Sequence, residues 1–480
     1  MLAVFIIYLV VTMFIAWWYS RGSRTNEEFV LGNKRFSGTA LALSERATGE
    51  SAWLLLGLTG LAFAEGLSSI WVALGCVVGI IFIWIVMAGR LRSETESTGA
   101  MTIPGLLGRK FPGSRRAISM LSAMIIIFFF VFYIAAQFAG SGKVMEKTFG
   151  LDPLWGIIIG SVVVTIYCIM GGFIAVVVTD VFQSILMIFT LVIFPVIAVY
   201  VIAANNIHFA EALSQAGPQI LSLTKMKTGG AAFLFILSGM SWALGYTGQP
   251  QLLSRMMAIR NKADVRKAKW VAIIWTLLAY TGAILIGLFG LALVRSGYLG
   301  SEAGRLAEDS EKILPVMVVT LVSPIMAGIL LSGVISAMMS TASSELTVSS
   351  ASLTEDIISH LKKNEIESSR KLWLNRLMTL AVGITAIILA LCLTDTVYGL
   401  VSYAWSGIGS SFGPALLLVL FWKRFSRAGV FASLISGTIG TIAWKIFFEE
   451  STGVSERLTS FVFAFAMAVL FSLIFPESKK

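Results

Sequence analysis

Apolar segments long enough to cross a membrane recur along the whole 480-residue chain. A helix needs about 20 apolar residues to cross a hydrocarbon core of roughly 30 Å. Because 57% of the residues are apolar and only 13% are charged, we predict an all-α polytopic membrane protein with about 13 transmembrane helices. The spans lie at about 1–19, 40–64, 68–89, 117–140, 153–171, 178–204, 230–257, 270–294, 322–354, 375–394, 396–422, 428–448 and 458–475.

The basic residues indicate how these spans are oriented. With the N-terminus outside, 26 of the 36 Lys and Arg residues fall in cytoplasmic segments, where such residues are in excess. We therefore predict a multi-pass protein of the plasma (inner) membrane, surrounded by membrane lipids, with a cytoplasmic C-terminus. The net charge of +10 then reports topology, and no nucleic-acid partner is expected. The predicted cytoplasmic segments are 20–35, 90–116, 255–269, 360–376, 423–427 and the C-terminal tail.

The chain lacks the common catalytic and metal-binding motifs. The sequence contains no HExxH, P-loop or GxSxG motif, and its three cysteines all lie in predicted spans. We therefore expect no enzyme and no disulfide framework. We expect residues 1–480 to form a single transmembrane domain, as a monomer or a weak oligomer.

The ninth span carries an unusual number of polar side chains. Residues 336–352 read SAMMSTASSELTVSSAS, which places nine hydroxyls and a carboxylate inside an apolar segment. Neutral hydroxyl and carbonyl oxygens suit a hard monovalent cation such as Na+. The same pattern also arises where small hydroxyl residues let two helices pack closely, and the residues alone leave both interpretations open. One helical stripe combines Ala337, Ser340, Thr341, Ser343 and Ser344.

Two other spans contain residues that interrupt a helix. In the second span, ALSERATGESAW (Ala42 to Trp53) places charged and small polar residues between apolar flanks. In the seventh, SGMSWALGYTGQPQ (Ser238 to Gln251) contains three glycines and Pro250, which removes an intrahelical hydrogen bond. Carbonyls freed by such breaks must face protein, water or a ligand, because lipid offers them no hydrogen bond.

The positions of the two broken spans indicate an internal symmetry. The second and seventh spans are the first members of two successive sets of five, at about 40–204 and 230–422, which enter the membrane from opposite sides. Matching discontinuous helices are typical of inverted-repeat transporters, whose binding site lies near the bilayer midplane. A peripheral helix at 1–19 and extra C-terminal helices at 428–475 flank the predicted repeats.

At these residues the chain resembles the sodium:solute symporter family, and within it the sodium/proline symporters. The resemblance implies an all-α LeuT-type 5+5 inverted-repeat core with discontinuous helices, and a symporter that imports a small organic solute with Na+ by alternating access. A proline-like amino acid is the first expected solute. Pantothenate, sialic acid, another carboxylate or a sugar, or a non-coupled sensor or channel, are the alternatives. The supporting segments are Phe29 to Gly38, Glu50 to Gly60, Ala88 to Arg92, Gly171 to Phe189, Leu244 to Ala258 and Ser336 to Leu346.

The resemblance also implies which residues bind the ion and the solute. The first sodium site takes carbonyls of Ala47, Glu50 and Ala337 with hydroxyls of Ser340 and Thr341. A second site, present in some members, takes Asp180, Ser340, Ser343 and Ser344. Asp180 also stands out by itself, because a carboxylate in an apolar span needs a cation or a donor. The solute site is implied to consist of Ser51, Trp53, Tyr133, Gln137, Trp242, Tyr246 and Pro250.

The break in the second span departs from the proline-symporter pattern. Gly49 stands where that pattern has an aspartate, Glu50 follows it, and Glu45 and Arg46 stand where it has small residues. Two interpretations remain open. Glu50 supplies the missing anionic group near sodium, or Arg46 and Glu50, spaced i, i+4, form an internal pair that fixes the break or contacts a solute carboxylate.

Overall fold

The computed structural model describes residues 1–21, 25–362, 366–392 and 396–477, and this part of the chain is helical without a strand. Residues 22–24 of the first predicted cytoplasmic segment, residues 363–365 of the fourth, residues 393–394 at the end of the tenth predicted span and the tail at 478–480 lie outside it. The prediction of an all-α polytopic membrane protein is confirmed.

Eleven helices of the described part are long and apolar enough to cross a membrane. Two of them, Gly38–Thr98 with 61 residues and Pro153–Ala204 with 52, are more than twice as long as one crossing requires. Each contains two of the predicted spans. Counted in this way, the described helices account for the thirteen spans expected from hydropathy.

The bounds of the elements are as follows. The N-terminal part holds α1 (Leu2–Ser20), α2 (Asn26–Leu31), α3 (Gly38–Ala52), α4 (Thr59–Glu65), α5 (Ile70–Phe82), α6 (Ala88–Thr98), α7 (Ile103–Lys110), α8 (Arg115–Phe149) and α9 (Pro153–Ala204). The middle part holds α10 (Phe209–Gln215), α11 (Pro218–Leu221), α12 (Gly229–Met240), α13 (Trp242–Tyr246), α14 (Pro250–Met257), α15 (Lys262–Arg295), α16 (Ala303–Glu308), α17 (Ile313–Leu321), α18 (Pro324–Ala351) and α19 (Ser359–Leu361). The C-terminal part holds α20 (Ser368–Cys392), α21 (Val397–Phe421), α22 (Arg427–Phe447), α23 (Glu449–Thr452) and α24 (Glu456–Ile474). Wider π-helical turns occur at Trp53–Leu58, Ile83–Met87 and Ser352–Ile358.

Two glycines divide the two longest helices. Gly66 has φ 64° and ψ −138°, and Gly172 has φ 52° and ψ −141°. A Cβ at Gly66 would lie 2.2 Å from the carbonyl oxygen of Ile220, and one at Gly172 would lie 2.6 Å from the ring of Phe29. Glycine alone adopts this backbone at no steric cost, so these residues let the chain change direction between successive spans.

The second and seventh spans are interrupted within the segments that the sequence indicated. Ser51, near the end of α3, has φ 35° and ψ −171°, a strained conformation for a residue with a side chain. In the seventh span the chain is non-helical at 247–249, and Pro250 begins α14. A Cβ at Gly248 would lie 2.6 Å from the backbone nitrogen of Gly413, so this break lets the chain pass close to α21.

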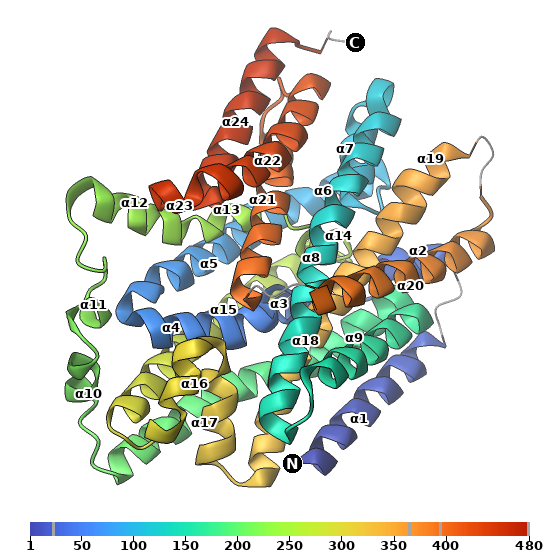
Figure 1. Cartoon of the computed structure of the whole chain (residues 1–480). Helices are drawn as coiled ribbons and strands as arrows, with labels where there is room; N and C mark the ends of the chain where they lie inside the picture. Colours follow the sequence, from blue (N-terminus) through green and yellow to red (C-terminus); the bar gives the residue numbers. More distant parts are fainter. Residues whose placement is uncertain (22–24, 363–365, 393–395, 478–480) are drawn as a thin grey trace.

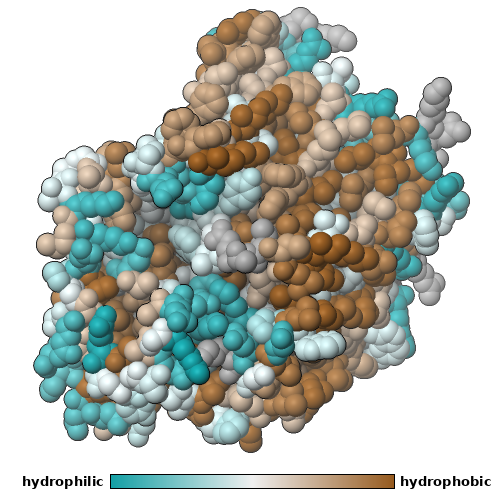
Figure 2. All heavy atoms as spheres, viewed as in Figure 1, coloured by the Kyte–Doolittle hydropathy of each residue, from teal (hydrophilic) through white to brown (hydrophobic). Residues whose placement is uncertain are grey.

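The ninth span occupies the centre of the bundle (Figure 1). It forms α18, which packs against α3, α8, α9 and α20. The N-terminus, α10 and α16 lie at the lower end of the molecule in Figure 1, whereas α7, α19 and the C-terminus lie at the upper end. Figure 2 shows hydrophobic residues over much of the flank formed by α8 and α20, with hydrophilic residues gathered over α16. The bundle therefore surrounds its polar helix with an apolar exterior, as a membrane requires.

Candidate functional site

The hydroxyls of α18 meet the end of α3 just before its break. Ser340 Oγ donates hydrogen bonds to the carbonyl oxygens of Ala47, at 2.8 Å, and Ala337, at 3.0 Å. Thr341 Oγ1 donates to the carbonyl oxygen of Thr48 at 2.7 Å. The Ser340–Ala47 and Thr341–Thr48 hydrogen bonds join α18 to α3, whereas the Ser340–Ala337 bond lies within α18. All five residues are fully buried. We call this set of oxygens the hydroxyl cluster.

One predicted ligand of the first sodium site is engaged elsewhere. The carbonyl oxygen of Glu50 accepts the backbone N–H of Trp53 across the break. The structure therefore brings together four of the five predicted residues, with Thr48 contributing a carbonyl that the sequence did not single out. A helix break frees carbonyl groups from their helical hydrogen bonds, so the sequence indicated free carbonyls near Thr48. It did not indicate which of these carbonyls faces α18.

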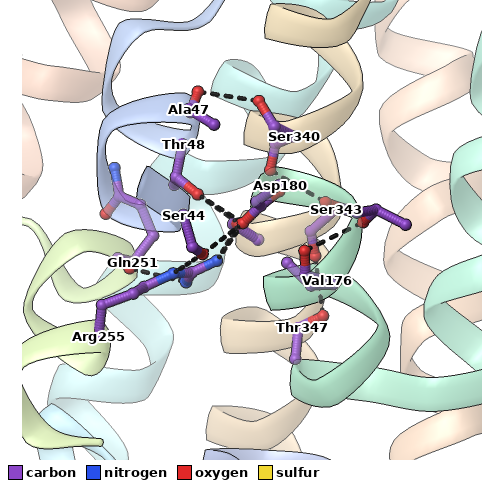
Figure 3. Close-up of polar contacts among 12 residues, drawn as sticks. Ser44, Ala47, Thr48, Val176, Asp180, Gln251, Arg255, Ser340, Ser343 and Thr347 are labelled. Carbon is purple, nitrogen blue, oxygen red and sulfur yellow. Dashed lines mark hydrogen bonds and ion pairs between the residues drawn. The ribbon is translucent and has the colours of Figure 1, made fainter. Parts of the chain in front are cut away.

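A second polar cluster lies on the other side of Thr48 (Figure 3). Asp180 Oδ2 accepts hydrogen bonds from Ser44 Oγ at 2.6 Å, from Thr48 Oγ1 at 3.3 Å and from the Arg255 guanidinium at 3.1 Å. Ser344 Oγ lies 2.8 Å from Thr48 Oγ1 and accepts a further bond from Arg255. We call these five residues the Asp180 cluster. It joins α3, α9, α14 and α18 around one carboxylate and one guanidinium.

Two residues predicted for the second sodium site do not contact this carboxylate. The Ser343 hydroxyl donates to the carbonyl oxygen of Ser340 at 2.9 Å, within its own helix, and Ser340 belongs to the hydroxyl cluster. Asp180 and Ser344 are brought together, but through Thr48 and Arg255. The other carboxylate oxygen, Asp180 Oδ1, is buried without a hydrogen-bond partner in the described part of the chain.

Arg255 is a residue of this cluster that the sequence did not single out. It lies where the predicted seventh span (230–257) overlaps the predicted cytoplasmic segment (255–269). In the structure it belongs to α14, which extends to Met257, and its side chain is only 1% exposed. Its guanidinium also bonds the carbonyl oxygen of Gln251 and lies 5.2 Å from the Phe173 ring. Arg255 precedes a run of basic residues, which on average marks a cytoplasmic loop. Such an average does not place a single residue.

The three charges at the α3 break neutralise one another in part. The Arg46 guanidinium bonds both carboxylate oxygens of Glu45 and lies 2.6 Å from Glu50 Oε1. Trp84 Nε1 donates to Glu45 at 3.0 Å, and Tyr280 donates to Glu50 at 2.6 Å. The sequence left two interpretations of this segment open, and the structure shows the Arg46–Glu50 pair that the second one proposes. The pair fixes the last turn of α3, and removing one partner of such a buried pair costs about 3–5 kcal/mol.

Aromatic side chains fill the space beside the α3 break. Trp53 and Trp242 stack with their ring centroids 4.5 Å apart and their planes 14° apart. Tyr246 meets Trp405 of α21 edge-on at 4.6 Å, and its hydroxyl lies 2.9 Å from that of Tyr280. These five side chains are buried, with at most 2% of their surface exposed. They form what we call the aromatic wall.

The remaining predicted solute residues border this wall. Tyr133 of α8 donates a long hydrogen bond of 3.5 Å to Ser51 Oγ, and Gln137 Oε1 accepts the backbone N–H of Ala52 at 2.9 Å. Pro250 begins α14 and has no polar side chain to contribute. The sequence did not single out Trp405 or Tyr280, because each lies in an apolar span where an aromatic residue is ordinary.

Several buried donors at the wall lack an acceptor in the described part of the chain. They include Nε2 of Gln137, Nε1 of Trp242 and Nε1 of Trp405. Buried polar groups are normally hydrogen-bonded, so an unpaired donor next to a site needs a reason. A ligand carboxylate would accept from such donors, while the rings shield an apolar body.

The comparisons with known proteins agree on the family. A family model described as the sodium:solute symporter family matches residues 29–437. The chain is 34% identical to the sodium/proline symporter of Escherichia coli (strain K12) over 99% of its own length and 93% of that protein. It is 33% identical to the osmoregulated proline transporter OpuE of Bacillus subtilis (strain 168), over 99% and 94%.

A solved structure agrees on the fold. A Na+-coupled sialic acid symporter, determined in a substrate-bound outward-open state, matches with a TM-score of 0.81. The match covers 98% of this chain and 97% of that one at 19% identity. The predicted LeuT-type architecture is thereby confirmed. Since the family model covers most of the sequence and full-length relatives exceed 30% identity, the chain belongs to the sodium:solute symporter family.

Proposed function

We propose that this protein imports a small zwitterionic solute, a proline-like amino acid, together with Na+ by alternating access. It acts as a single transmembrane domain of the plasma (inner) membrane, with its N-terminus outside, and carries out no covalent chemistry. The repeats at about 40–204 and 230–422 rock against each other around the site. The names of the full-length relatives, which are proline transporters, support the choice of solute.

One observation carries the proposal: the α3 break lies between the hydroxyl cluster and the aromatic wall. Before the break, the carbonyls of Ala47 and Thr48 accept hydrogen bonds from α18. After it, Trp53 stacks on Trp242 in the aromatic wall. An ion that fixes the carbonyls therefore fixes the start of the wall. Na+ then tightens solute binding, and solute must tighten Na+ binding by the same factor.

Na+ is proposed to bind in the hydroxyl cluster. The hydroxyls of Ser340 and Thr341 point at carbonyl oxygens, and rotation of each O–H turns its lone pairs toward a cation placed among them. Ala47, Thr48 and Ala337 supply carbonyls. The donor set is neutral oxygen throughout, which suits a hard monovalent ion.

We assign one Na+ to each transported solute. The Asp180 cluster has the carboxylate and hydroxyls of a second sodium site, but Arg255 supplies a positive charge there at 3.1 Å. A second cation beside that guanidinium would meet charge repulsion in a low-dielectric interior. Arg255 thus acts as a fixed cation where some relatives of this family bind a second sodium ion.

The aromatic wall and its unpaired donors support a small zwitterion as solute. The stacked rings of Trp53 and Trp242 suit an apolar ring or chain, and the free donors of Gln137 and Trp405 suit a carboxylate. Glu45, Arg46 and Glu50 together leave one net negative charge behind the wall, where Tyr280 donates to Glu50. This arrangement favours solutes that carry a positive group as well as a carboxylate.

Uptake of radiolabelled L-proline into proteoliposomes tests the proposal. We expect accumulation driven by an inward Na+ gradient and none with choline or a proton gradient, at a measured ratio of one Na+ per proline. Equal uptake under all three conditions would show that sodium coupling is wrong. If Na+ drives no proline uptake, a thermal-shift screen of amino acids and other carboxylates with and without NaCl identifies the solute, because a ligand of the folded state stabilises it.

A further inference from the structure

A cleft lies on the surface between α6, the start of α15 and the end of α21. Its volume is about 750 Å³, and α15 packs against α6 beside it. Two of the predicted cytoplasmic segments, 90–116 and 255–269, contribute residues to it. Among the described residues, none of those placed in the ion and solute sites lines it. The lining includes cationic Arg90, Lys262 and Arg266 and apolar Ile85, Val86 and Val265.

The three cations of the cleft have no carboxylate partner. Arg90, Lys262 and Arg266 are exposed, and none of them forms an ion pair with another described residue. The Arg90 guanidinium donates to the carbonyl oxygen of Leu420 at 3.4 Å and lies 4.2 Å from the centroid of the Phe421 ring. Neither of these neighbours carries a charge, so all three positive charges remain uncompensated.

Carboxylates on the same two helices are engaged by other cations. Glu94, which lines the cleft from α6, forms an ion pair with Lys110 of α7. Asp264 of α15 is buried, and it forms an ion pair with Arg260 at 3.0 Å. The cleft therefore carries a net positive charge that an anionic ligand would neutralise.

Apolar side chains continue from the cleft along both helices that border it. Val78 and Ile85 are exposed, about two helical turns apart, on α5 and the turn after it. On α15, Trp270 and Ile274 follow Arg266 at intervals of four residues and are 59% and 56% exposed. Tryptophan is enriched where headgroups meet acyl chains. The cleft therefore lies at that boundary, with its cations on the headgroup side.

An anionic phospholipid has both features that such a cleft requires. Its phosphate accepts hydrogen bonds from ammonium and guanidinium groups, and arginine can bind it with two parallel bonds. Its acyl chains cover apolar side chains. A Cβ at Gly89, which lines the cleft, would have no neighbour within 4 Å beyond its own backbone, so a headgroup has room there. Basic pockets between transmembrane helices on the cytoplasmic side bind anionic headgroups in other membrane proteins.

Two simpler occupants match only part of the cleft. Free phosphate would use the three cations but leave the neighbouring apolar surface uncovered. A zwitterionic phospholipid such as phosphatidylcholine would cover that surface, but its choline group would bring a further positive charge to the cations. The combination of uncompensated cations and exposed apolar residues therefore favours a lipid with a net negative headgroup.

We propose that this cleft binds an anionic phospholipid of the cytoplasmic leaflet, whose phosphate is held by Arg90, Lys262 and Arg266. The lipid would contact both predicted repeats, because α6 belongs to 40–204 whereas α15 and α21 belong to 230–422. This inference goes beyond the proposed function, since it depends neither on Na+ nor on the identity of the solute.

Thermal unfolding of the delipidated full-length protein in a neutral detergent tests the lipid site. We expect phosphatidylglycerol to stabilise the protein at concentrations on the order of a hundredfold lower than phosphatidylcholine, as three cations beside one anionic headgroup provide. Inorganic phosphate at the same concentrations should have no effect. Raising the salt concentration should reduce the preference for phosphatidylglycerol, because salt screens exposed charges.

Replacing the three cations by glutamine should abolish the preference for phosphatidylglycerol over phosphatidylcholine. The matched control removes the same number of charges from predicted cytoplasmic segments outside the cleft, and it should keep the preference of the wild type. This control combines the substitutions of three exposed residues: Arg116→Gln, Lys267→Gln and Arg370→Gln.

A further variant fills the cleft without changing its charge. Gly89→Leu places a side chain in the open space beside α6 and should not destabilise the lipid-free protein, because leucine forms helices better than glycine. It should need about tenfold more phosphatidylglycerol for the same stabilisation, as expected where an added side chain blocks a site.

Three results would overturn the proposal. Equal stabilisation of the wild type by phosphatidylglycerol and phosphatidylcholine would mean that lipid covers the surface without recognition of charge. Stabilisation by inorganic phosphate as strong as that by phosphatidylglycerol would identify a site for small anions. An equal loss of preference in the matched control would show a general effect of surface charge. All three are measured without transport, so failure of the proposed function is distinguishable from failure of this inference.

Discussion

Two polar clusters meet at Thr48, and they differ in how their oxygens are satisfied. In the hydroxyl cluster, neutral O–H groups of Ser340 and Thr341 bond backbone carbonyls. In the Asp180 cluster, a carboxylate is bonded by hydroxyls and by the Arg255 guanidinium. Both clusters are buried and both join α3 to α18, yet only the Asp180 cluster already contains a positive charge.

The comparison indicates that oxygen ligands alone do not make a cation site. The site must also lack a positive charge of its own. Neutral hydroxyls and carbonyls accept an added Na+ by rotating their O–H groups, at little electrostatic cost. A carboxylate paired with Arg255 has no such need, and an added ion would have to displace the guanidinium. The family resemblance implied two sodium sites, whereas the charge balance supports one.

Removing the fixed cation should have the largest effect. Arg255→Gln leaves Asp180 charged and unpaired, which we expect to cost about 3–5 kcal/mol of stability in sodium-free buffer. Because the Asp180 cluster would then resemble a second sodium site, NaCl should restore part of the lost thermal stability, and more than it stabilises the wild type. Thermal unfolding with NaCl and with choline chloride measures both effects.

The matched control for that experiment removes both charges. Asp180→Asn combined with Arg255→Gln leaves no unpaired charge, so it should be more stable than Arg255→Gln alone and should show no additional response to NaCl. An equal sodium response in Arg255→Gln and in the wild type would contradict the view that Arg255 stands in for a cation.

Substitutions in the hydroxyl cluster should have the next largest effect, on ion binding more than on stability. Ser340→Ala or Thr341→Ala removes one proposed sodium ligand, and we expect the Na+ concentration for half-maximal uptake to rise about tenfold. Ser343→Ala is the control, because its hydroxyl bonds only a carbonyl of its own helix at 2.9 Å. Its Na+ requirement should stay within about twofold of the wild type.

Comparing Ser343→Ala with Ser340→Ala and Thr341→Ala also distinguishes the first predicted sodium site from the second. If Ser343→Ala raised the Na+ requirement as strongly as Ser340→Ala, the second site expected from the family resemblance would exist in this chain. If neither Ser340→Ala nor Thr341→Ala changed the Na+ dependence, the assignment of sodium to the hydroxyl cluster would be wrong. Protein level in the membrane, measured in parallel, excludes a folding defect.

Much of the fold could be predicted from local patterns, because hydropathy determines spans and helix-breaking residues determine interruptions. The breaks at Ser51 and before Pro250, and the polar stripe on α18, are patterns of this kind. The partners of Asp180 could not be predicted, since Arg255 lies 75 residues away and a single sequence carries no pairing information. The same holds for Trp405, which reaches the site from α21.

Thr48 tests whether the two clusters are independent, and its substitution should have the smallest effect. Thr48 Oγ1 lies 2.8 Å from Ser344 Oγ and 3.3 Å from Asp180, so its side chain belongs to the Asp180 cluster. Its carbonyl accepts from Thr341 at 2.7 Å, so its backbone belongs to the hydroxyl cluster. Thr48→Val keeps the shape and the carbonyl but removes the hydroxyl.

We therefore expect Thr48→Val to lower stability by about 1 kcal/mol, the value of one buried hydrogen bond, while the Na+ requirement for uptake stays within about twofold of the wild type. Thr48→Ser retains the hydroxyl and should behave like the wild type in both measurements. A rise in the Na+ requirement of Thr48→Val as large as that of Ser340→Ala would mean that the ion also depends on the Thr48 hydroxyl. The two clusters would then form one site, and Arg255 would border the sodium ion instead of replacing a second one.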